Sequence, residues 1–416
     1  MSFYSSGQVK SEIVEPSIDS SRNRSEFRLP KGDLLPNLKL CNVGLAGSAA
    51  APYNAAVGGL SCIKNLYLFD GKTELQSVRS FNDYKALHNL RNDNRNNSEV
   101  RRYTEKSEIG YANRYDLANK ERRVVVKDPL SVDISTADTP AGANKAFLDV
   151  SECMNFLKGI PVLSSSVFKN LRLVVEYESD NRKMITRDDK DATVAVAGTT
   201  RPLLVVDRVE DESVAASLRA RMANFQFVVH ERDRIPVKAI TAGASATTAR
   251  RILGFNNKNV QRIAIRKSFN NPASNFASNA VQGYGPYNSV NGLSERYQVV
   301  LNGRSLFPRD GLPGDNRALA HLTDTYGSFN MPDGANSNYS LTNIERYSVS
   351  NLAGNLDFFG TFIGEQVQDL RIEYSRTGHA TDASAVKRYN DALDLHVEAE
   401  VVKQISFGNG GYLVSY

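Results

Sequence analysis

The sequence repeats one short pattern at a separation of 199 residues, and this duplication limits the folds open to the chain. Val150-Ser151 is followed 21 residues later by Leu171-Arg172, which begins an apolar run rich in β-branched residues. Val349-Ser350 is followed at the same spacing by Leu370-Arg371, which begins a second such run. Solenoid repeats have periods of only about 20–50 residues. The repeat therefore indicates two domains of one design in tandem.

Segments on both sides extend each copy. Upstream, an apolar run ends in a glycine followed by a basic residue, Gly71-Lys72 in the first copy and Gly303-Arg304 in the second. Downstream, another alternating segment begins at Pro202 in the first copy and at Ala392 in the second. Alternation of apolar and polar residues is typical of a half-buried strand. Each copy is thus predicted to contain several strands.

Most of the chain from Phe27 onward consists of short runs rich in Val, Ile, Leu and Tyr, separated by clusters of Gly, Pro, Asn and Asp. This spacing favours antiparallel sandwiches or barrels over a parallel α/β sheet. Helical patterns are short, and Ser151 is predicted to cap one of them. The predicted helices cover residues 81–90, 148–159, 213–222 and 383–393. The predicted fold class is all-β with a few short helices.

Three units are predicted along the chain. Residues 1–26 are polar, rich in Ser and Arg, and unpatterned, so a flexible N-terminal arm is expected there. Residues 27–210 and 211–416 each hold one copy of the repeat and are predicted to be separate β domains. Long polar segments within them are expected to be loops at the sandwich ends. These segments are residues 89–98, 270–291 and 327–340.

Composition excludes several classes of protein. The net charge of +5 is small, and acidic residues interrupt the basic runs, so strong attraction to nucleic acid is not indicated. Cys41, Cys62 and Cys153 are odd in number and far apart, which indicates neither a zinc ribbon nor a disulfide framework. The N-terminus lacks the apolar core of a signal peptide, and no apolar run is long enough to span a membrane. We therefore expect synthesis in the cytoplasm without a signal peptide.

Motifs for catalysis, metal binding and cofactor binding are incomplete. His230-Glu231 begins like a zinc-protease motif, but Arg234 stands where the second histidine ligand belongs. The five histidines are scattered, and the carboxylates of 188–191 lack the glycine and alternate spacing of a calcium loop. No phosphate-binding loop or nucleophile elbow is present. We expect no catalytic residues, no cofactor and no metal, and hence a structural or binding protein.

The order of elements resembles that of the double jelly-roll major capsid proteins of the adenovirus and tailless-phage lineage, most closely those of polinton-like viruses and virophages. Five segments, spread over both halves of the chain, carry the resemblance. They are residues 53–72, 147–178, 297–308, 319–327 and 352–375. The resemblance implies two tandem eight-stranded jelly-roll sandwiches. It rests on the order, the duplication and the size, since no single motif is highly specific.

What the resemblance implies about function is an assembly role. Such a chain would be the major capsid protein of an icosahedral double-stranded DNA virus, located in the virion shell, with three subunits forming a pseudo-hexagonal capsomer. Its partners would be the other subunits of a homotrimer, neighbouring capsomers, and penton and minor capsid proteins. Arg22, Arg24 and Arg28, in or next to the arm, are the expected contacts on the inner face, with weak binding of the arm to an internal membrane or DNA.

Two other functions remain open from the sequence. The first is a tandem β-sandwich that binds carbohydrate, such as an attachment protein. Lectin-like sites usually include an exposed aromatic platform, and the chain contains no Trp, which counts against that function. The second is an enzyme on a β-sandwich scaffold, which lacks the groupings that acid–base or metal chemistry requires.

Overall fold

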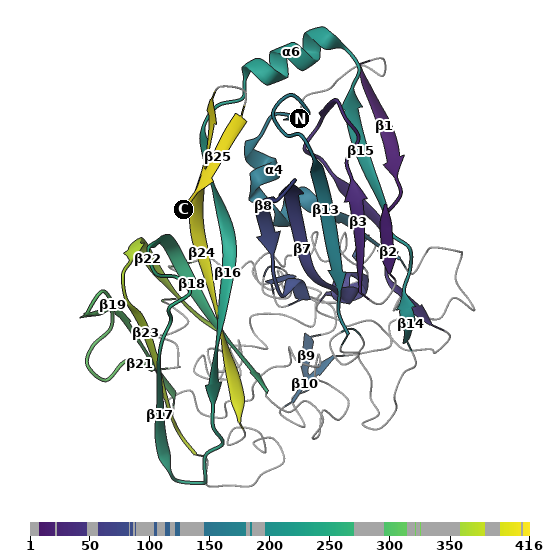
Figure 1. Ribbon diagram of the computed structural model, residues 1–416. Coiled ribbons are helices and arrows are strands. Elements are labelled where there is room, and N and C mark those ends of the chain that lie inside the picture. Colours follow the sequence, from purple (N-terminus) through teal and green to yellow (C-terminus); the bar gives the residue numbers. More distant parts are fainter. Residues whose placement is uncertain are drawn as a thin grey trace, which may run out of the picture.

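The computed structural model describes residues 8–20, 23–47, 57–82, 84–85, 88, 104–105, 113–116, 121–124, 145–179, 184, 196–269, 295–313, 321, 325, 358–378, 392–408 and 411–416. Strands dominate this part of the chain (Figure 1). Up to residue 209 they are β1 (Val9–Val14), β2 (Ile18–Ser20), β3 (Arg24–Arg28), β4 (Asp33–Leu34), β5 (Lys39–Val43), β6 (Leu45–Gly47), β7 (Ile63–Asp70), β8 (Thr73–Val78), β9 (Asn113–Asp116), β10 (Glu121–Val124), β11 (Ala146–Asp149), β12 (Leu163–Ser164), β13 (Leu171–Tyr177), β14 (Val196–Thr199) and β15 (Leu203–Val209).

The later strands are β16 (Phe225–Val237), β17 (Ser245–Arg251), β18 (Lys258–Phe269), β19 (Glu295–Leu301), β20 (Arg304–Ser305), β21 (Leu312–Pro313), β22 (Phe358–Val367), β23 (Leu370–Thr377), β24 (Leu393–Gly408) and β25 (Gly411–Ser415). Short helices lie between them, namely the 3₁₀ helix η1 (Gly58–Cys62), α3 (Val150–Cys153), α4 (Asn155–Gly159) and α6 (Glu212–Ala220). Among the described residues, no helix has the length and apolar character needed to cross a bilayer.

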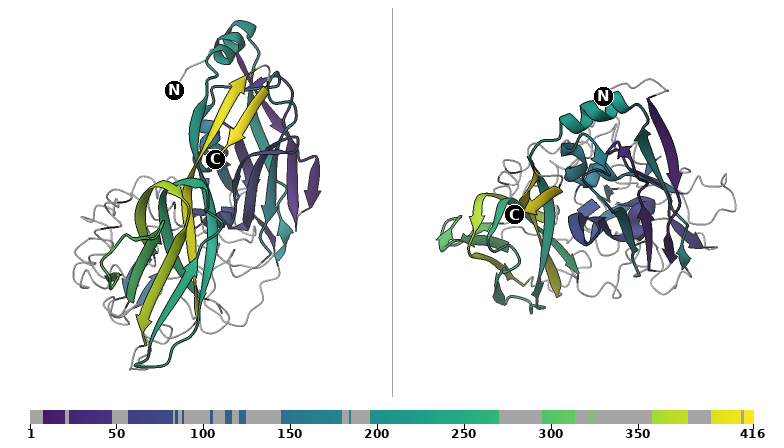
Figure 2. Two further views of the ribbon diagram at one scale, coloured as in Figure 1. Left: turned by 60° about the vertical axis from the view of Figure 1, so that its left-hand side comes forward. Right: turned by 45° about the horizontal axis from the view of Figure 1, so that its top comes forward.

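Strand pairing divides the chain into two lobes. Within the described part, β1–β15 pair only with one another and form the N-terminal lobe, and β16–β25 form the C-terminal lobe. Helix α6 crosses from one lobe to the other at the top of Figure 1, and both views in Figure 2 show the lobes side by side. The limits 27–210 and 211–416 stay a proposal for the extent of the two domains.

The two main sheets of each lobe have the same strand order. In the N-terminal lobe, β1, β15, β5 and β11 are successive neighbours, as are β16, β24, β18 and β22 in the C-terminal lobe. The second sheets run β3-β13-β7-β8 and β17-β23-β19-β20. Eight strands in each lobe therefore occupy equivalent places in a two-sheet sandwich. The prediction of two domains of one design is confirmed at the level of strand topology.

The repeated Leu-Arg pair begins equivalent strands. Leu171 opens β13 opposite Asp70 at the end of β7, and Leu370 opens β23 opposite Leu301 at the end of β19. Leu370 is fully buried and Leu171 nearly so, because both face the space between the two sheets. The matching Val150-Ser151 pair lies at the start of α3, while Val349-Ser350 falls outside the described residues.

The Gly-basic turns are also equivalent. Gly71 has φ of +58° and Gly303 has φ of +78°, which are left-handed values that glycine adopts at no steric cost. Beside each turn, a backbone hydrogen bond joins the turn to the residue that precedes the neighbouring strand. The amide of Gly71 donates to the Asn170 carbonyl, and the amide of Asn302 donates to the Asp369 carbonyl. The sequence pattern therefore marks the same hairpin in both lobes.

The prediction of a flexible arm over residues 1–26 is wrong for the described residues 8–20 and 23–26. Strand β1 pairs with β15 from Val9 opposite Val209 to Val14 opposite Leu204, and it is the counterpart of β16. Only one face of this edge strand meets the core, where Val14 packs. Three apolar residues among polar ones are enough for such a strand, which is why composition alone suggested an unpatterned arm.

The helix predictions are confirmed in part. Residues 213–222 overlap α6, and the described residues of 81–90 (81, 82, 84, 85 and 88) are helical. Residues 148–159 contain two short helices with a break at Met154 rather than one. The predicted cap is wrong, because Asp149 accepts the amide hydrogen of Ser151 and is itself the N-cap of α3. Residues 383–391 lie outside the described residues, and Leu393 begins a strand.

Candidate functional site: the interface between the lobes

Aromatic side chains from both lobes form a cluster where the lobes meet. Phe156 of α4 lies with its ring centre 5.9 Å from that of Phe225 and 5.5 Å from that of Phe227, both on β16. Its ring also meets that of Phe168 edge-on at 6.0 Å. Phe156 and Phe168 are buried, and one continuous hydrophobic core joins the two lobes. Burial of this kind fixes the orientation of one lobe on the other.

Buried polar groups align the same interface. Gln76 on β8 is fully buried, accepts the amide hydrogen of Phe156 at 2.8 Å, and donates to the Val228 carbonyl at 3.5 Å. Asn155 donates to the same carbonyl at 3.1 Å. A buried polar group that is left without its hydrogen-bond partner destabilises the fold. These bonds therefore favour one position of α4 and β8 relative to β16.

The C-terminal strand reaches back to the N-terminal lobe. The hydroxyl of Tyr412 on β25 donates to the Asp70 carboxylate at 3.0 Å, and its ring centre lies 4.9 Å from that of Phe168. Burial raises the pKa of the Tyr412 hydroxyl, and the Asp70 charge raises it further. At the end of the chain, the ammonium groups of Lys403 and Lys258 lie 4.4 Å and 4.7 Å from the ring centre of Tyr416. Through Tyr412, the C-terminal strand β25 is thus joined directly to the N-terminal lobe.

A third group of contacts involves the helical residues Tyr84 and Lys85. The ring of Tyr84 lies 4.7 Å from that of His230 on β16, and His230 Nδ1 lies 3.0 Å from the Glu398 carboxylate. Next to Tyr84, Lys85 is 1% exposed, and its ammonium lies 2.6 Å from the Glu105 carboxylate. His230 was considered above as an incomplete metal motif, and in the structure it belongs to this interface.

Gly159 of α4 lies directly against the ring of Phe225 on β16. A Cβ atom at this position would lie 2.4 Å from the ring of Phe225, and the ring is held by the other aromatic groups. We expect Gly159→Ala to lower the free energy of unfolding by about 1–3 kcal/mol, as overpacking usually does. Gly254→Ala is the matched control, because a Cβ there meets nothing within 4 Å. Urea unfolding followed by circular dichroism measures both, and equal losses would contradict the steric cause.

The cysteines differ in burial rather than in pairing. All three are free; Cys62 and Cys153 are buried, and Cys41 is partly exposed. Burial raises the pKa of the Cys62 and Cys153 thiols to about 12 from an ordinary 9.0. These two cysteines therefore pack as small buried apolar residues.

This difference predicts the thiol chemistry of the native chain. A pKa raised by three units lowers the thiolate fraction at pH 8 roughly a thousandfold. Cys41 should therefore react first with a disulfide reagent, and Cys62 and Cys153 only on unfolding. Since the folded state holds these thiols neutral, their contribution to stability is complete below pH 9 and is lost as the pH rises above it. Fast modification of more than one thiol in the native protein would contradict the prediction.

Two of the three predicted arginines are described. Arg24 and Arg28 lie on β3, where the Arg24 guanidinium is 3.2 Å and the Arg28 guanidinium 4.0 Å from the buried carboxylate of Glu26. Arg172 on β13 also lies 3.4 Å from Glu26. Arg22 falls outside the described residues. The two arginines thus share one intramolecular partner, and their role in contacts on an inner face stays a prediction.

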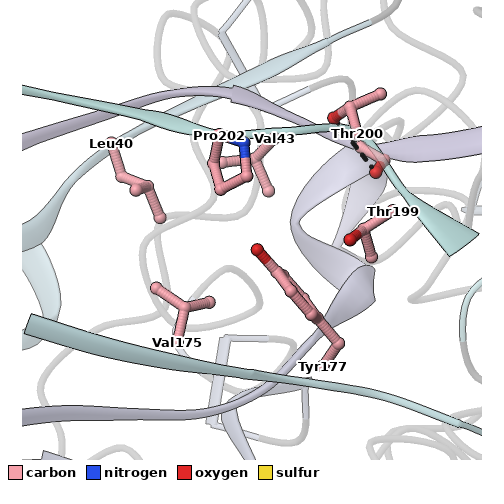
Figure 3. Close-up of a pocket in the computed structure, with 8 residues that line it drawn as sticks. Leu40, Val43, Val175, Tyr177, Thr199, Thr200 and Pro202 are labelled. Atoms are coloured by element: carbon pink, nitrogen blue, oxygen red, sulfur yellow. Dashed lines mark hydrogen bonds between the residues drawn. The ribbon is translucent and has the colours of Figure 1, made fainter. Parts of the chain in front are cut away.

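No site for a ligand stands out in the described part of the chain. Within it, no group of His, Cys, Asp and Glu residues could hold a metal ion, and residues 188–191 lie outside it. A narrow gap lies between the sheets of the N-terminal lobe, with Tyr177 and Val175 facing Leu40 and Pro202 (Figure 3). It has no room for a water-sized molecule, whereas typical ligand sites enclose roughly 300–1,000 Å³. Tyr177 instead forms a 2.6 Å hydrogen bond with Ser25.

Comparison with solved structures identifies the fold. The chain superposes on VP54 of PBCV-1, from a crystal structure fitted into a reconstruction of the virophage Sputnik, with a TM-score of 0.60, 12% identity, and coverage of 100% of this chain and 99% of VP54. A quasi-atomic model of the PBCV-1 capsid gives a TM-score of 0.56 at 12% identity, with coverage of 100% of this chain and 99% of the other. A cryo-EM structure of the Sputnik virophage gives a TM-score of 0.54 at 9% identity, with coverage of 100% of this chain and 89% of the other.

These matches extend over the whole chain, and the fold is the double jelly roll of viral capsid proteins. The predicted fold class, all-β with two tandem eight-stranded jelly-roll sandwiches and a few short helices, is therefore confirmed. Neither a protein-family model nor a curated protein matches the sequence.

Sequence reasoning did not find the aromatic interface. In the sequence, Phe225 and Phe227 look like ordinary residues of a strand, although their i, i+2 spacing places both rings on one face. Their partner Phe156 is near the repeated Val-Ser pattern, but nothing in the sequence links it to β16. A pair of aromatic residues on one face of the first strand after a domain boundary is the sequence feature that could have indicated part of this interface.

Proposed function

We propose that the chain is the major capsid protein of an icosahedral double-stranded DNA virus and has a structural role without an active site. The duplicated sandwich, joined by a buried interface, is the observation that supports this function. Two equivalent lobes per chain let three chains present six similar lobes around one axis, and such a tile packs in a hexagonal array. The full-length likeness to proteins of the PBCV-1 capsid and the Sputnik virophage supports the same function.

The assembly that we propose is a homotrimer in the virion shell. Its further partners would be neighbouring capsomers, penton proteins and minor capsid proteins. The N-terminal residues with Arg22, Arg24 and Arg28 would face the interior and contact an internal membrane or DNA. Because Arg24 and Arg28 share the Glu26 carboxylate, this contact would be weak.

Sedimentation equilibrium of the purified full-length chain tests the trimer. The chain has a mass of 45.9 kDa, so the proposal predicts a species of three times that mass over a wide concentration range. A carbohydrate-binding attachment protein has no need of this stoichiometry and would instead bind a glycan array. A monomer that binds glycans would contradict the proposed function.

A further inference from the structure

The strand β17 lies at the edge of its sheet as far as the structure describes that sheet. Ser245–Arg251 pairs with β23 along one side, and six of its seven residues are exposed, with Thr248 half-buried. No described strand pairs with its other side. The strand itself lies at the lower left of Figure 1. Exposed strand edges are templates for pairing with another chain, and soluble proteins usually protect them.

The register shows which backbone groups face outward. The amide of Ile252 donates to the Leu370 carbonyl at 2.7 Å, so residues an even number of positions before Ile252 exchange hydrogen bonds with β23. These residues are Arg250, Thr248 and Ala246. The amides and carbonyls of the alternate residues therefore point away from the sheet. They belong to Ser245, Thr247, Ala249 and Arg251.

The equivalent edge of the N-terminal lobe is covered. Strand β3 is the counterpart of β17, and β2 pairs along its outer side from Ile18 opposite Glu26 to Ser20 opposite Arg24. The two lobes thus contain equivalent sheets but differ at this edge. The position that β2 occupies in the N-terminal lobe is taken by no described strand in the C-terminal lobe.

The side chains of β17 suit pairing with an identical strand. Ser245–Ala249 are all small, and Thr favours strands. The charges, Arg250 and Arg251, stand at one end. In an antiparallel pair centred on Thr248, Arg250 lies opposite Ala246 and Arg251 opposite Ser245 of the other copy. The four arginines are thereby kept apart, whereas a parallel pair would set like charges side by side, which is unfavourable.

We propose that β17 pairs with β17 of a second copy of this chain, antiparallel and about a two-fold axis at Thr248. The inference rests on the proposed function and deepens it, because an icosahedral shell has two-fold axes, and each of them relates two neighbouring tiles. A seven-residue edge contact is smaller than a stable isolated interface requires. It acts together with the many equivalent contacts of a shell, where effective concentration strengthens each one.

Cysteine cross-linking tests the pairing in full-length chains that carry Cys41→Ser, which removes the one partly exposed native thiol. In Thr248→Cys, the two new cysteines would face each other in a non-hydrogen-bonded pair with Cα atoms about 4.5 Å apart, which a disulfide can bridge. In the matched control Thr247→Cys, the two would lie diagonally, roughly 7–8 Å apart and beyond that reach. We expect mild oxidation of assembled particles to give at least about tenfold more covalent dimer for Thr248→Cys.

A proline variant gives a second readout. Thr247→Pro removes an outward amide without breaking a bond to β23, so the chain should keep its melting temperature and its trimer but lose most assembly into shells. Thr247→Ala keeps the amide and should assemble normally.

The outcomes separate this inference from the proposed function. Shells of trimers in which neither cysteine cross-links would overturn the pairing and leave the capsid function intact. A Thr248→Cys cross-link to a different protein of the particle would assign the edge to another partner and overturn it equally. Absence of trimers from the unaltered chain would instead contradict the proposed function. Should Thr247→Pro fail to fold, the cross-linking result decides.

Discussion

Phe156→Ala is expected to lower the free energy of unfolding by about 3–5 kcal/mol, the usual loss for truncating a buried phenylalanine. The side chain is fully buried and contacts rings from both lobes, so its removal leaves a cavity that neither lobe can close alone. Because the chain contains no Trp, far-ultraviolet circular dichroism in urea is the suitable measurement. Phe362→Ala is the matched control, since that ring is 64% exposed and its loss should change stability by less than about 0.5 kcal/mol.

The same variant should also affect assembly. Phe156 fixes the angle between the lobes, and a closed ring of three chains tolerates little variation in that angle. We therefore expect Phe156→Ala to reduce trimer formation at concentrations where the monomer is still folded. A variant that loses stability but forms normal trimers would show that the interface stabilises the lobes without setting their geometry.

Lys85→Met is the second substitution with a large expected effect, a loss of about 3–5 kcal/mol. The ammonium of Lys85 is 1% exposed and lies 2.6 Å from the Glu105 carboxylate, which is 5% exposed. Glu152, which is half-exposed, lies 3.5 Å from the same ammonium. Met conserves the length of the side chain but removes the ammonium group that pairs with the buried Glu105 charge. Chemical unfolding should therefore show a far larger loss than that caused by Lys158→Met, at an exposed lysine.

A double substitution separates the charge from the packing. In Lys85→Met with Glu105→Leu, both buried charges are replaced by apolar groups, and most of the lost stability should return. If the double variant is as unstable as Lys85→Met alone, the loss comes from packing or from other contacts of Glu105, and the ion-pair explanation is wrong.

The fold class could be predicted because the repeated signals are local. A Leu-Arg pair opens β13 and β23, and a glycine turn joins β7 to β8 and β19 to β20, so each signal acts within a few residues of its own strand. Periodicity and turn chemistry are the parts of a fold that a sequence records most directly.

The N-terminal strand could not be predicted for the opposite reason. Val9–Val14 owes its strand conformation to β15, which lies about two hundred residues away in the sequence. An edge strand with one face in solvent needs few apolar residues, so its composition is close to that of a flexible arm. The error at Ser151 is smaller in scale, since the N-cap of α3 is Asp149, only two residues earlier, and Ser151 donates its own amide hydrogen to that carboxylate.

The interface between the lobes also depends on distant pairs. Tyr412 and Asp70 are 342 residues apart, and no local pattern connects them. Each side chain alone looks like an ordinary strand residue. The lobe arrangement, which is the part of the structure most relevant to assembly, therefore had to come from three-dimensional contacts.

Negative-stain electron microscopy of the purified, unaltered chain tests the central claim most directly. If the duplicated lobes form a tile, class averages should show a particle with a hexagonal outline and six peripheral densities around a three-fold axis. A uniform population of two-lobed monomers at all concentrations would contradict the account.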